Sequence, residues 1–481
     1  CAAVRRELLA WVRRAVWMLL RERTQVSRTA PRHTCKRLTP QQIIPMLTLT
    51  IIAALTTTAL ACNTAEELRR DLATSFNSHN GLGSIVRDES ILRDSGSRVG
   101  PIVKLPQTGS NTDPAALDGS PYAFYFVPST SGSTQWTINI EGGGWCYDET
   151  LCYARSKTKL GTSTVLPPTS GCGCMNTDAQ GPVSDCNCLY MPYLDGASFS
   201  GYRAEPWPVP NTNGSTLTFR GIKNIDATLQ WAFERGLATN ATEFVLTGGS
   251  AGGLSTFLHA DRVADQIRAR NPGIQKIVAA PVVGYFLDHP DIDGTVGQPN
   301  TPTWLKEDYT DWMKYIYTMQ NLTFGNDGGL MESCQRKHLK EPWLCFMSPH
   351  MQDVIQTPFF VFNSKYDAWQ INEILKANPW SHNTTRQNSI VQYGVDFLTA
   401  FQPVMINWEN LTHGCFITSC ICHGCPWGEQ SALVFKTLNP YQAYANWYTG
   451  KTKGMDNIHI DPRQPNGGGT ITDPACKSYP N

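Results

Sequence analysis

Apolar residues along the chain are grouped in short runs that alternate with amphipathic stretches. The short runs are rich in β-branched and aromatic residues, as expected for buried strands. Strands are predicted at 122–127, 136–140, 244–247, 277–283 and 359–362. Apolar residues recur at helical spacing over 222–235 and again from Leu254 to Val263. Strands that alternate with helices predict an α/β domain with a mainly parallel central sheet flanked by helices.

The first 61 residues have a different pattern, which predicts a leader. Ile43 to Ala61 is uncharged and apolar and ends in Ala59-Leu60-Ala61, as in a signal peptide cleaved near Ala61. A membrane anchor is the alternative, but the run is barely long enough to span a bilayer and contains a proline and several threonines. We therefore expect secretion to the extracellular space or cell wall, without stable membrane insertion after cleavage.

Residues 1–45 precede Met46 and are rich in arginine. They fit a transit peptide, an amphipathic surface helix or sequence upstream of the true start, and we favour the last. After the leader, residues 62–100 are expected to form a short helix, which a capping box at Thr64 to Glu67 begins, and a polar linker. A single large domain is expected to span 101–481.

The net charge of zero conceals an asymmetry between the leader and the rest of the chain. Residues 1–61 contain ten of the 40 basic residues and two of the 40 acidic ones, so the remainder has 30 basic and 38 acidic residues and a net charge of −8. A body this acidic argues against general nucleic-acid binding, which needs a basic surface.

Cysteines and glycosylation sequons both favour an oxidising compartment. Without Cys1 and Cys35, 14 of the 16 cysteines remain, an even number that could all pair. The Cys/Gly/Pro-rich segment 162–189 is predicted to be a disulfide-stapled surface insertion. Asn-x-Ser/Thr sequons occur at Asn213, Asn240, Asn321, Asn383 and Asn410.

The pentapeptide Gly248-x-Ser250-x-Gly252 carries the strongest chemical signal. It follows a predicted strand and precedes a predicted helix, which is the layout of a nucleophile elbow. The turn at the serine must be so sharp that neighbouring side chains would clash, which accounts for the glycines. Ser250 is therefore the candidate nucleophile, at a helix N-terminus where the dipole and the backbone N–H groups favour a developing oxyanion.

A nucleophilic serine needs a base and a residue that orients the base. In α/β-hydrolases the acid follows the serine and precedes the histidine. Asp367 follows a late strand and fits this order, although a turn or capping aspartate is the alternative. Among the later histidines, His423 lies between cysteines whose disulfides could hold a loop rigid, and His413 ranks next. His382 and His413 are expected in exposed loops, and His459 in a polar tail.

Three consecutive glycines at 142–144 follow the strand 136–140, as the glycine-rich loop of lipases and esterases follows a strand. A tight turn is the alternative, but three glycines cost folding entropy and favour close approach of backbone to substrate. The adjacent Trp145 is a candidate wall of the acyl pocket, with a core tryptophan as the alternative. The expected oxyanion donors are the N–H groups of Gly143, Gly144 and Ala251.

Zinc binding is an alternative role for two cysteine clusters. Cys172-x-Cys174 with Cys186-x-Cys188, and Cys420-x-Cys422-His423-x-Cys425, superficially resemble zinc ligand sets. In a secreted chain such cysteines are usually oxidised, and Cys-x-Cys is less usual for structural zinc than Cys-x-x-Cys. Disulfides are therefore favoured over zinc.

Taken together, these motifs resemble the pectin acetylesterase family, which includes the Notum carboxylesterases. The matching stretches, in the family's order, are 140–146, 193–201, 219–221, 247–253, 344–346, 366–370 and 416–423. The resemblance implies a secreted serine esterase of α/β-hydrolase-like fold with disulfide-stapled loops, without metal or organic cofactor. It also implies that Ser250, Asp367 and His423 form the catalytic triad, because each falls on a motif position of the family.

Two positions depart from the family's pattern. Gly249 stands where the family commonly has cysteine. The family commonly has Cys-Phe-Ala-His-Cys around the histidine, whereas the segment Cys420 to Cys425 contains an additional glycine and cysteine. This second departure concerns the local disulfide pattern more than the base itself.

The expected function is removal of O-acetyl groups from pectin or a related cell-wall polysaccharide by a monomeric enzyme. One alternative is Notum-like removal of a longer acyl chain from a protein or lipid. The other is a catalytically silent carbohydrate-binding glycoprotein, against which the complete triad counts. A net charge of −8 is unfavourable for a polyanionic pectin unless a local basic groove offsets it.

Overall fold

The computed structural model describes most of the chain after residue 97. The described residues are 98–175, 185–292, 308–324, 327–378, 384–406, 412–423, 425 and 437–463. The chain divides into two compact units, Cys1–Ser84 and Ile85–Asn481, and all described residues belong to the second. The predicted leader, the predicted helix that begins near Thr64 and nearly all of the predicted linker lie outside the described residues.

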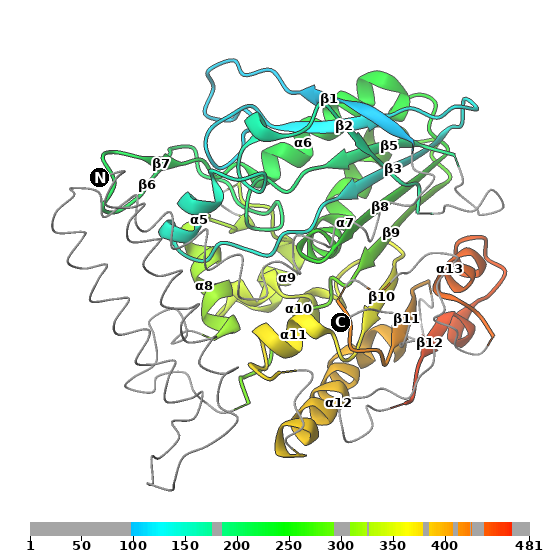
Figure 1. Cartoon of the computed structure of the whole chain (residues 1–481). Coiled ribbons are helices and arrows are strands. Elements are labelled where there is room, and N and C mark those ends of the chain that lie inside the picture. Colours follow the sequence, from blue (N-terminus) through cyan, green and yellow to red (C-terminus); the bar gives the residue numbers. More distant parts are fainter. Residues whose placement is uncertain are drawn as a thin grey trace, which may run out of the picture. The chain divides into compact units, whose positions relative to one another are not determined.

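A ten-stranded sheet runs through the described part of the chain (Figure 1). Its strands are β1 (Val99–Lys104), β2 (Ala123–Val127), β3 (Gln135–Ile140), β4 (Thr169–Gly171), β5 (Asn187–Met191), β8 (Glu243–Gly249), β9 (Lys276–Val282), β10 (Phe360–Ser364), β11 (Gly414–Thr418) and β12 (Ile458–Ile460). Their order across the sheet is β12-β11-β10-β9-β8-β3-β5-β2-β1-β4. The first seven strands in this order are parallel, and β2, β1 and β4 add antiparallel pairs at one edge. A separate hairpin pairs β6 (Trp207–Pro208) with β7 (Thr216–Leu217).

The five predicted strands correspond to β2, β3, β8, β9 and β10, and the prediction of a mainly parallel sheet is confirmed. In β8 every residue after Glu243 is buried, and β9 is likewise buried after Lys276. Such continuous burial is expected where helices cover both faces of a parallel sheet. The two strands pair in register from Glu243 opposite Lys276 to Gly249 opposite Val282.

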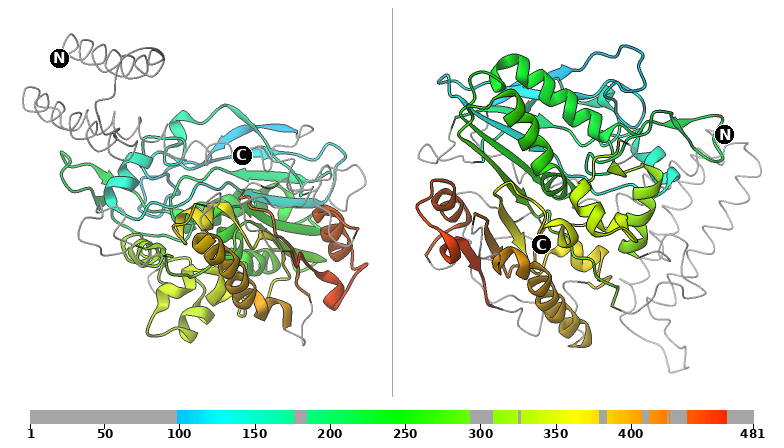
Figure 2. Two further views of the ribbon diagram at one scale, coloured as in Figure 1. Left: turned by 60° about the horizontal axis from the view of Figure 1, so that its bottom comes forward. Right: turned by 180° about the vertical axis from the view of Figure 1, so that it is seen from behind.

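Helices lie on both faces of this sheet (Figures 1 and 2). They are α5 (Glu149–Arg155), α6 (Gly221–Ala232), α7 (Ala251–Arg270), α8 (Tyr309–Met319), α9 (Glu332–Lys337), α10 (Ser348–Met351), α11 (Ala368–Glu373), α12 (Thr384–Ile406) and α13 (Pro440–Tyr448). Adjacent residues of β8 belong to different cores: Leu246 packs in the core that contains Phe257 of α7, and Val245 in the core that contains Tyr444 of α13. The predicted α/β-hydrolase-like architecture is therefore confirmed.

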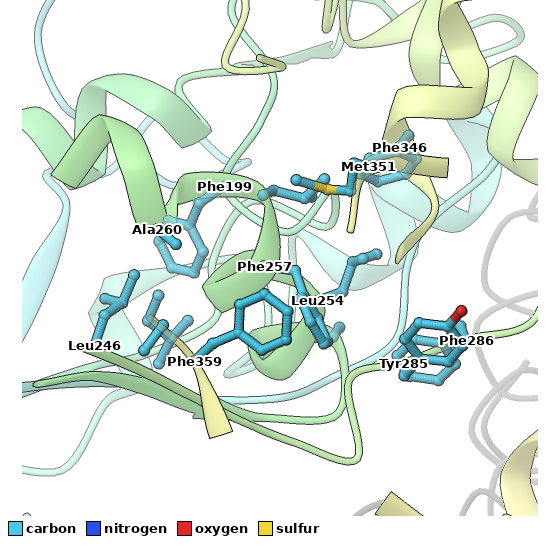
Figure 3. Close-up of a cluster of buried hydrophobic side chains, with 14 of the residues drawn as sticks. Phe199, Leu246, Leu254, Phe257, Ala260, Tyr285, Phe286, Phe346, Met351 and Phe359 are labelled. Atoms are coloured by element: carbon cyan, nitrogen blue, oxygen red, sulfur yellow. The ribbon is translucent and has the colours of Figure 1, made fainter. Parts of the chain in front are cut away.

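The α7 helix is anchored by aromatic packing, which Figure 3 shows in close-up. The Phe257 ring meets those of Tyr285 and Phe359 edge to face, with centroids 6.1 and 5.6 Å apart. Leu254, one turn closer to the N-terminus of α7, is fully buried in the same cluster. This packing fixes the N-terminal turn of α7, and with it Ser250 at the end of β8.

The prediction that residues 162–189 form a surface insertion is wrong at two places. Thr169–Gly171 is strand β4, which pairs with β1, and Asn187–Leu189 belong to β5, which lies between β3 and β2 within the sheet. The predicted disulfide staple is present as Cys172–Cys188 and Cys174–Cys186. The apolar run of β5 is short and merges with the cysteine cluster, so the sequence pattern alone did not separate it.

Not every cysteine outside the leader is paired. Cys415 in β11 is a free thiol within the core, and burial raises its pKa to about 12. Further disulfides join Cys146 to Cys152, Cys334 to Cys345 and Cys422 to Cys425. Among the described residues, no helix is both long enough and apolar enough to cross a membrane.

Candidate active site

Ser250 occupies the sharp turn between β8 and α7. Its backbone has a φ of 56° and a ψ of −124°, a conformation that residues other than glycine adopt only under constraint. A Cβ at Gly248 would lie 2.5 Å from the carbonyl oxygen of Gly252, and a Cβ at Gly252 only 2.3 Å from that of Ile140. The two glycines of the motif are therefore required by close backbone packing, as the sequence predicted.

The structure brings Asp367 and His423 together with Ser250. The Nε2 atom of His423 lies 2.8 Å from the Ser250 Oγ, and its Nδ1 lies 2.8 Å from the nearer carboxylate oxygen of Asp367. When Nδ1 donates its proton to the carboxylate, Nε2 is left free to accept the serine proton. Asp367 is fully buried, follows β10 and caps α11 by accepting the N–H of Gln370 at 3.0 Å.

The His423 imidazole is held from several sides. The Cys422–Cys425 disulfide closes a short loop around it, just beyond β11. The rings of Phe286 and Trp369 flank it, each with a centroid 6.2 Å from that of the imidazole. The side chain is only 13% exposed, so its orientation is fixed by packing as well as by the Asp367 hydrogen bond.

The other candidate histidines lie elsewhere. His413 stacks on Phe359 at a centroid distance of 3.9 Å and accepts the Phe359 N–H at 3.2 Å. Burial lowers its pKa to about 4, so the expectation of an exposed loop is wrong for this residue. His459 is also mispredicted, because it is a buried residue of β12 and not part of a polar tail. His382 lies outside the described residues.

The glycine loop at 142–144 approaches the elbow closely. A Cβ at Gly142 would lie 2.6 Å from the Gly249 carbonyl oxygen and 2.8 Å from the Ser250 Cβ. Gly144 has a φ of +62°, which favours glycine. The N–H groups of the loop's Gly143 and Gly144, and of Ala251, donate to no other group within the described part of the chain, and neither does the N–H of Trp145. The expected donors are therefore available next to the serine.

Trp145 is anchored in an aromatic cluster. Its ring lies edge to face against Phe286 and Trp369, with centroids 4.9 and 5.5 Å away, and these two rings also flank His423. The indole Nε1–H donates to the Ser198 Oγ at 2.9 Å. At 8% exposure, Trp145 is both a packed residue and a neighbour of the catalytic imidazole.

Gln370 is a site residue that the sequence did not identify. Its Nε2 donates to the Tyr285 carbonyl at 2.9 Å, and its Oε1 accepts the Leu287 N–H and the Tyr393 hydroxyl. It thereby fixes the segment that carries Phe286. The residue lies in the motif 366–370, but the motif alone does not indicate what an amide at its last position contacts.

Other features of the described residues do not contribute to this site. An open cleft of about 810 Å³ is lined mainly by α6, α7, the start of α9 and the residues before it, and no triad residue lines it. The candidate active site is therefore identified from its hydrogen-bonded residues and not from that cleft.

The zinc alternative is not supported at the first cysteine cluster. The sulfurs of Cys172, Cys174, Cys186 and Cys188, which a zinc site would need, form disulfides. Within the described ranges, no group of three or more candidate ligands could hold a metal ion.

Comparison with known proteins reveals related sequences that cover most of the chain. The family model described as pectinacetylesterase matches residues 103–467. Two curated proteins of Arabidopsis thaliana are similar. Pectin acetylesterase 11 is 28% identical over 73% of this chain and 88% of its own length, and pectin acetylesterase 5 is 31% identical over 72% and 80%.

More distant relatives belong to the animal branch. Human palmitoleoyl-protein carboxylesterase NOTUM is 27% identical over 54% of this chain and 50% of its own length. Among solved structures, that of the Wnt deacylase Notum from Drosophila matches with a TM-score of 0.59 and 23% identity, covering 74% of this chain and 94% of the other. This structural match supports the fold.

Proposed function

The chain belongs to the pectinacetylesterase family, and from that membership we propose that Ser250, His423 and Asp367 are the catalytic triad of a secreted esterase. The family makes the protein a carboxylic ester hydrolase that acts on acyl ester substrates. The observation that carries the proposal is the continuous hydrogen-bonded path from the Asp367 carboxylate through the His423 ring to the Ser250 hydroxyl, with 2.8 Å at both steps.

The reaction proceeds in two acyl-transfer steps. The Nε2 of His423 accepts the proton of the Ser250 hydroxyl while Oγ attacks the ester carbonyl carbon, and Asp367 stabilises the imidazolium through Nδ1–H. The tetrahedral intermediate collapses as His423 returns the proton to the leaving alcohol, which leaves an acyl-serine. Water, deprotonated by His423, then attacks this ester and releases the carboxylic acid and the free serine.

The oxyanion of each tetrahedral intermediate accepts hydrogen bonds from the N–H groups of Gly143, Gly144 and Ala251. Ala251 is the first residue of α7, so its N–H has no partner inside the helix. The close packing of Gly142 on the elbow supports this assignment, since it holds the loop next to the serine. Loss of one such donor typically lowers turnover by about 10²–10³-fold.

The proposed substrate is an O-acetyl ester on pectin or a related wall polysaccharide. Supporting it, the plant pectin acetylesterases match about three quarters of this chain, whereas human NOTUM matches about half. Trp145 and the neighbouring rings of Phe286 and Trp369 would wall the acyl pocket. The second candidate is removal of a longer acyl chain from a protein, the chemistry named for NOTUM.

The proposed location is the extracellular space or the cell wall. Residues 1–61 would act as a leader that is removed, 62–100 as a short helix and linker, and 101–481 as the catalytic domain. The disulfides in the described part of the catalytic domain support an oxidising compartment.

Hydrolysis of acetyl, butyryl and octanoyl esters by the wild type, Ser250→Ala and Ser255→Ala tests both parts of the proposal. Ser255 is a second buried serine, on α7, and its replacement is the matched control. We expect Ser250→Ala to lose hydrolysis of every ester and Ser255→Ala to keep it, with kcat/KM highest for acetyl. Activity that persists in Ser250→Ala would refute the triad, and a preference for octanoyl would favour the second candidate substrate.

A further inference from the structure

Arg155 is the last residue of α5, and its side chain contacts the glycine loop and the adjacent Trp145. One guanidinium nitrogen donates to the Gly143 carbonyl oxygen at 2.8 Å, and another donates to that of Trp145 at 3.1 Å. The disulfide between Cys146 and Cys152 connects the residue after Trp145 to the middle of α5. This bond brings the end of the helix, and with it the guanidinium, against the loop.

These two hydrogen bonds determine where the loop's N–H groups point. In a planar trans peptide the C=O of one residue and the N–H of the next point in opposite directions. Because the Gly143 carbonyl points at Arg155, the Gly144 N–H must point away from the guanidinium. The peptide that follows Trp145 is held at both ends, since its carbonyl binds Arg155 and the Cys146 N–H donates to the Gly196 carbonyl at 3.1 Å.

The guanidinium donates to the backbone carbonyls of Gly143 and Trp145. Among the described residues, the guanidinium forms no ion pair with a carboxylate. Burial lowers the pKa of Arg155, and the Asp195 carboxylate, when ionised, opposes that shift. Asp195 is itself buried, which raises its pKa to about 7, and it accepts the N–H groups of Ala197 and Phe199. A partly buried cation that is bound by carbonyls without a carboxylate partner is costly for stability, which favours a role in function.

We propose that Arg155 is a positioning residue, which holds the peptide between Gly143 and Gly144 so that the Gly144 N–H donates to the oxyanion. This inference rests on the proposed function, since it presupposes the Ser250 reaction. The residue acts through the backbone and touches no reacting atom. Its planar fork of donors suits two carbonyls at once, which the compact ammonium of lysine cannot match.

Steady-state hydrolysis of a small acetyl ester by Arg155→Ala, Arg155→Lys and Arg203→Ala tests the proposal. Arg203 is the matched control, because it also donates to two backbone carbonyls, those of Thr318 and Met319, away from the glycine loop. We expect kcat to fall by roughly 10²-fold in Arg155→Ala and less in Arg155→Lys, with KM unchanged, since only the transition state uses the oxyanion donor. Arg203→Ala should keep the wild-type kcat.

Added methylguanidinium should restore part of kcat in Arg155→Ala and leave Arg203→Ala unchanged, a response that a general loss of stability would not produce. Equal kcat values in the folded Arg155 and Arg203 variants would overturn the proposal. A higher KM with an unchanged kcat in the Arg155 variants would overturn it as well. If Arg155→Ala does not fold, the test rests on Arg155→Lys. A wild-type kcat in Arg155→Lys would overturn the proposal. Failure of the proposed function is distinguishable, because hydrolysis would then persist in Ser250→Ala.

Discussion

The elbow at Ser250 and the loop at His423 hold their catalytic side chains in different ways. At the elbow, backbone packs against backbone: Gly252 approaches the Ile140 carbonyl, and Gly142 approaches the Gly249 carbonyl, so closely that neither has room for a Cβ. The His423 ring is instead held by side chains, by the Asp367 carboxylate, two aromatic rings and a local disulfide.

This difference explains where the sequence can depart from the family's pattern. A Cβ at position 249 would meet no atom within 4 Å, so glycine here and cysteine elsewhere in the family both fit. Around His423 the side-chain contacts fix the ring, so the segment Cys420 to Cys425 can differ from the family's pattern while the base keeps its hydrogen bonds to Asp367 and Ser250. Positions fixed by backbone packing tolerate no added volume, whereas positions fixed by side chains tolerate changes in the chain between them.

Asp367→Asn should produce the largest loss of activity. It changes the region of the site in which side chains hold the His423 ring. Asparagine preserves the shape and the cap of α11, but as an amide it no longer favours the imidazole tautomer with a proton on Nδ1. We expect kcat for an acetyl ester to fall by about 10⁴-fold, with an unchanged circular dichroism spectrum. A kcat within tenfold of the wild type would show that His423 does not depend on this carboxylate.

Gly252→Ala should have the next largest effect, because it should lower the stability of the folded protein. Its Cβ would lie 2.3 Å from the Ile140 carbonyl oxygen, so the elbow must shift, at an expected cost of about 4 kcal/mol or more in the free energy of unfolding. The control Gly249→Ala should cost less than about 1 kcal/mol, because that site is open. Urea unfolding measures both, and equal costs would contradict the backbone-packing account of the elbow.

Removal of the Cys422–Cys425 disulfide should lower both stability and kcat moderately. The bond closes a loop of four residues, so replacing both cysteines with serine should cost about 2 kcal/mol of stability. Because the loop carries the base, kcat should fall as well, by about tenfold. Serines at Cys334 and Cys345, whose disulfide joins α9 to the residues before α10, should lower stability and leave kcat unchanged. An unchanged kcat in the first variant would mean that packing alone holds His423.

Acid should destabilise the fold through two neutral histidines, His259, which is buried in α7, and His413, which is half-buried just before β11. Burial lowers the pKa of each from 6.5 to about 4. The unfolded chain therefore binds protons below pH 6.5 that the folded chain does not, and stability falls until about pH 4. Each should cost about 1 kcal/mol between pH 7 and 5.5.

His413→Gln should remove one such contribution, because glutamine does not titrate. The free energy of unfolding of this variant should therefore change less between pH 7 and 5.5 than that of the wild type. Equal pH dependence in the wild type and in His413→Gln would contradict the assignment of a neutral His413 with a lowered pKa.

Local patterns in the sequence predicted the elbow and the parallel strands β3, β8, β9 and β10, but not β11 and β12. The patterns gave Asp367 and His423 as candidates, and the resemblance to the family selected them. Each of these predictions follows from the burial of a short run, from the steric demand of a turn, or from a motif. The position of β5 between β3 and β2 was missed, because strand pairing joins segments that are distant in the chain. Arg155 and Gln370 were missed because their partners are largely backbone groups, which have no signature in the sequence.

The most direct test of the triad is to label the protein with a fluorophosphonate and to map the adduct by mass spectrometry. We expect one adduct per molecule, on Ser250, and none in Ser250→Ala or after His423→Ala, because the hydroxyl is nucleophilic only beside its base. An adduct on another serine of the folded wild type, or undiminished labelling without His423, would contradict the proposed triad.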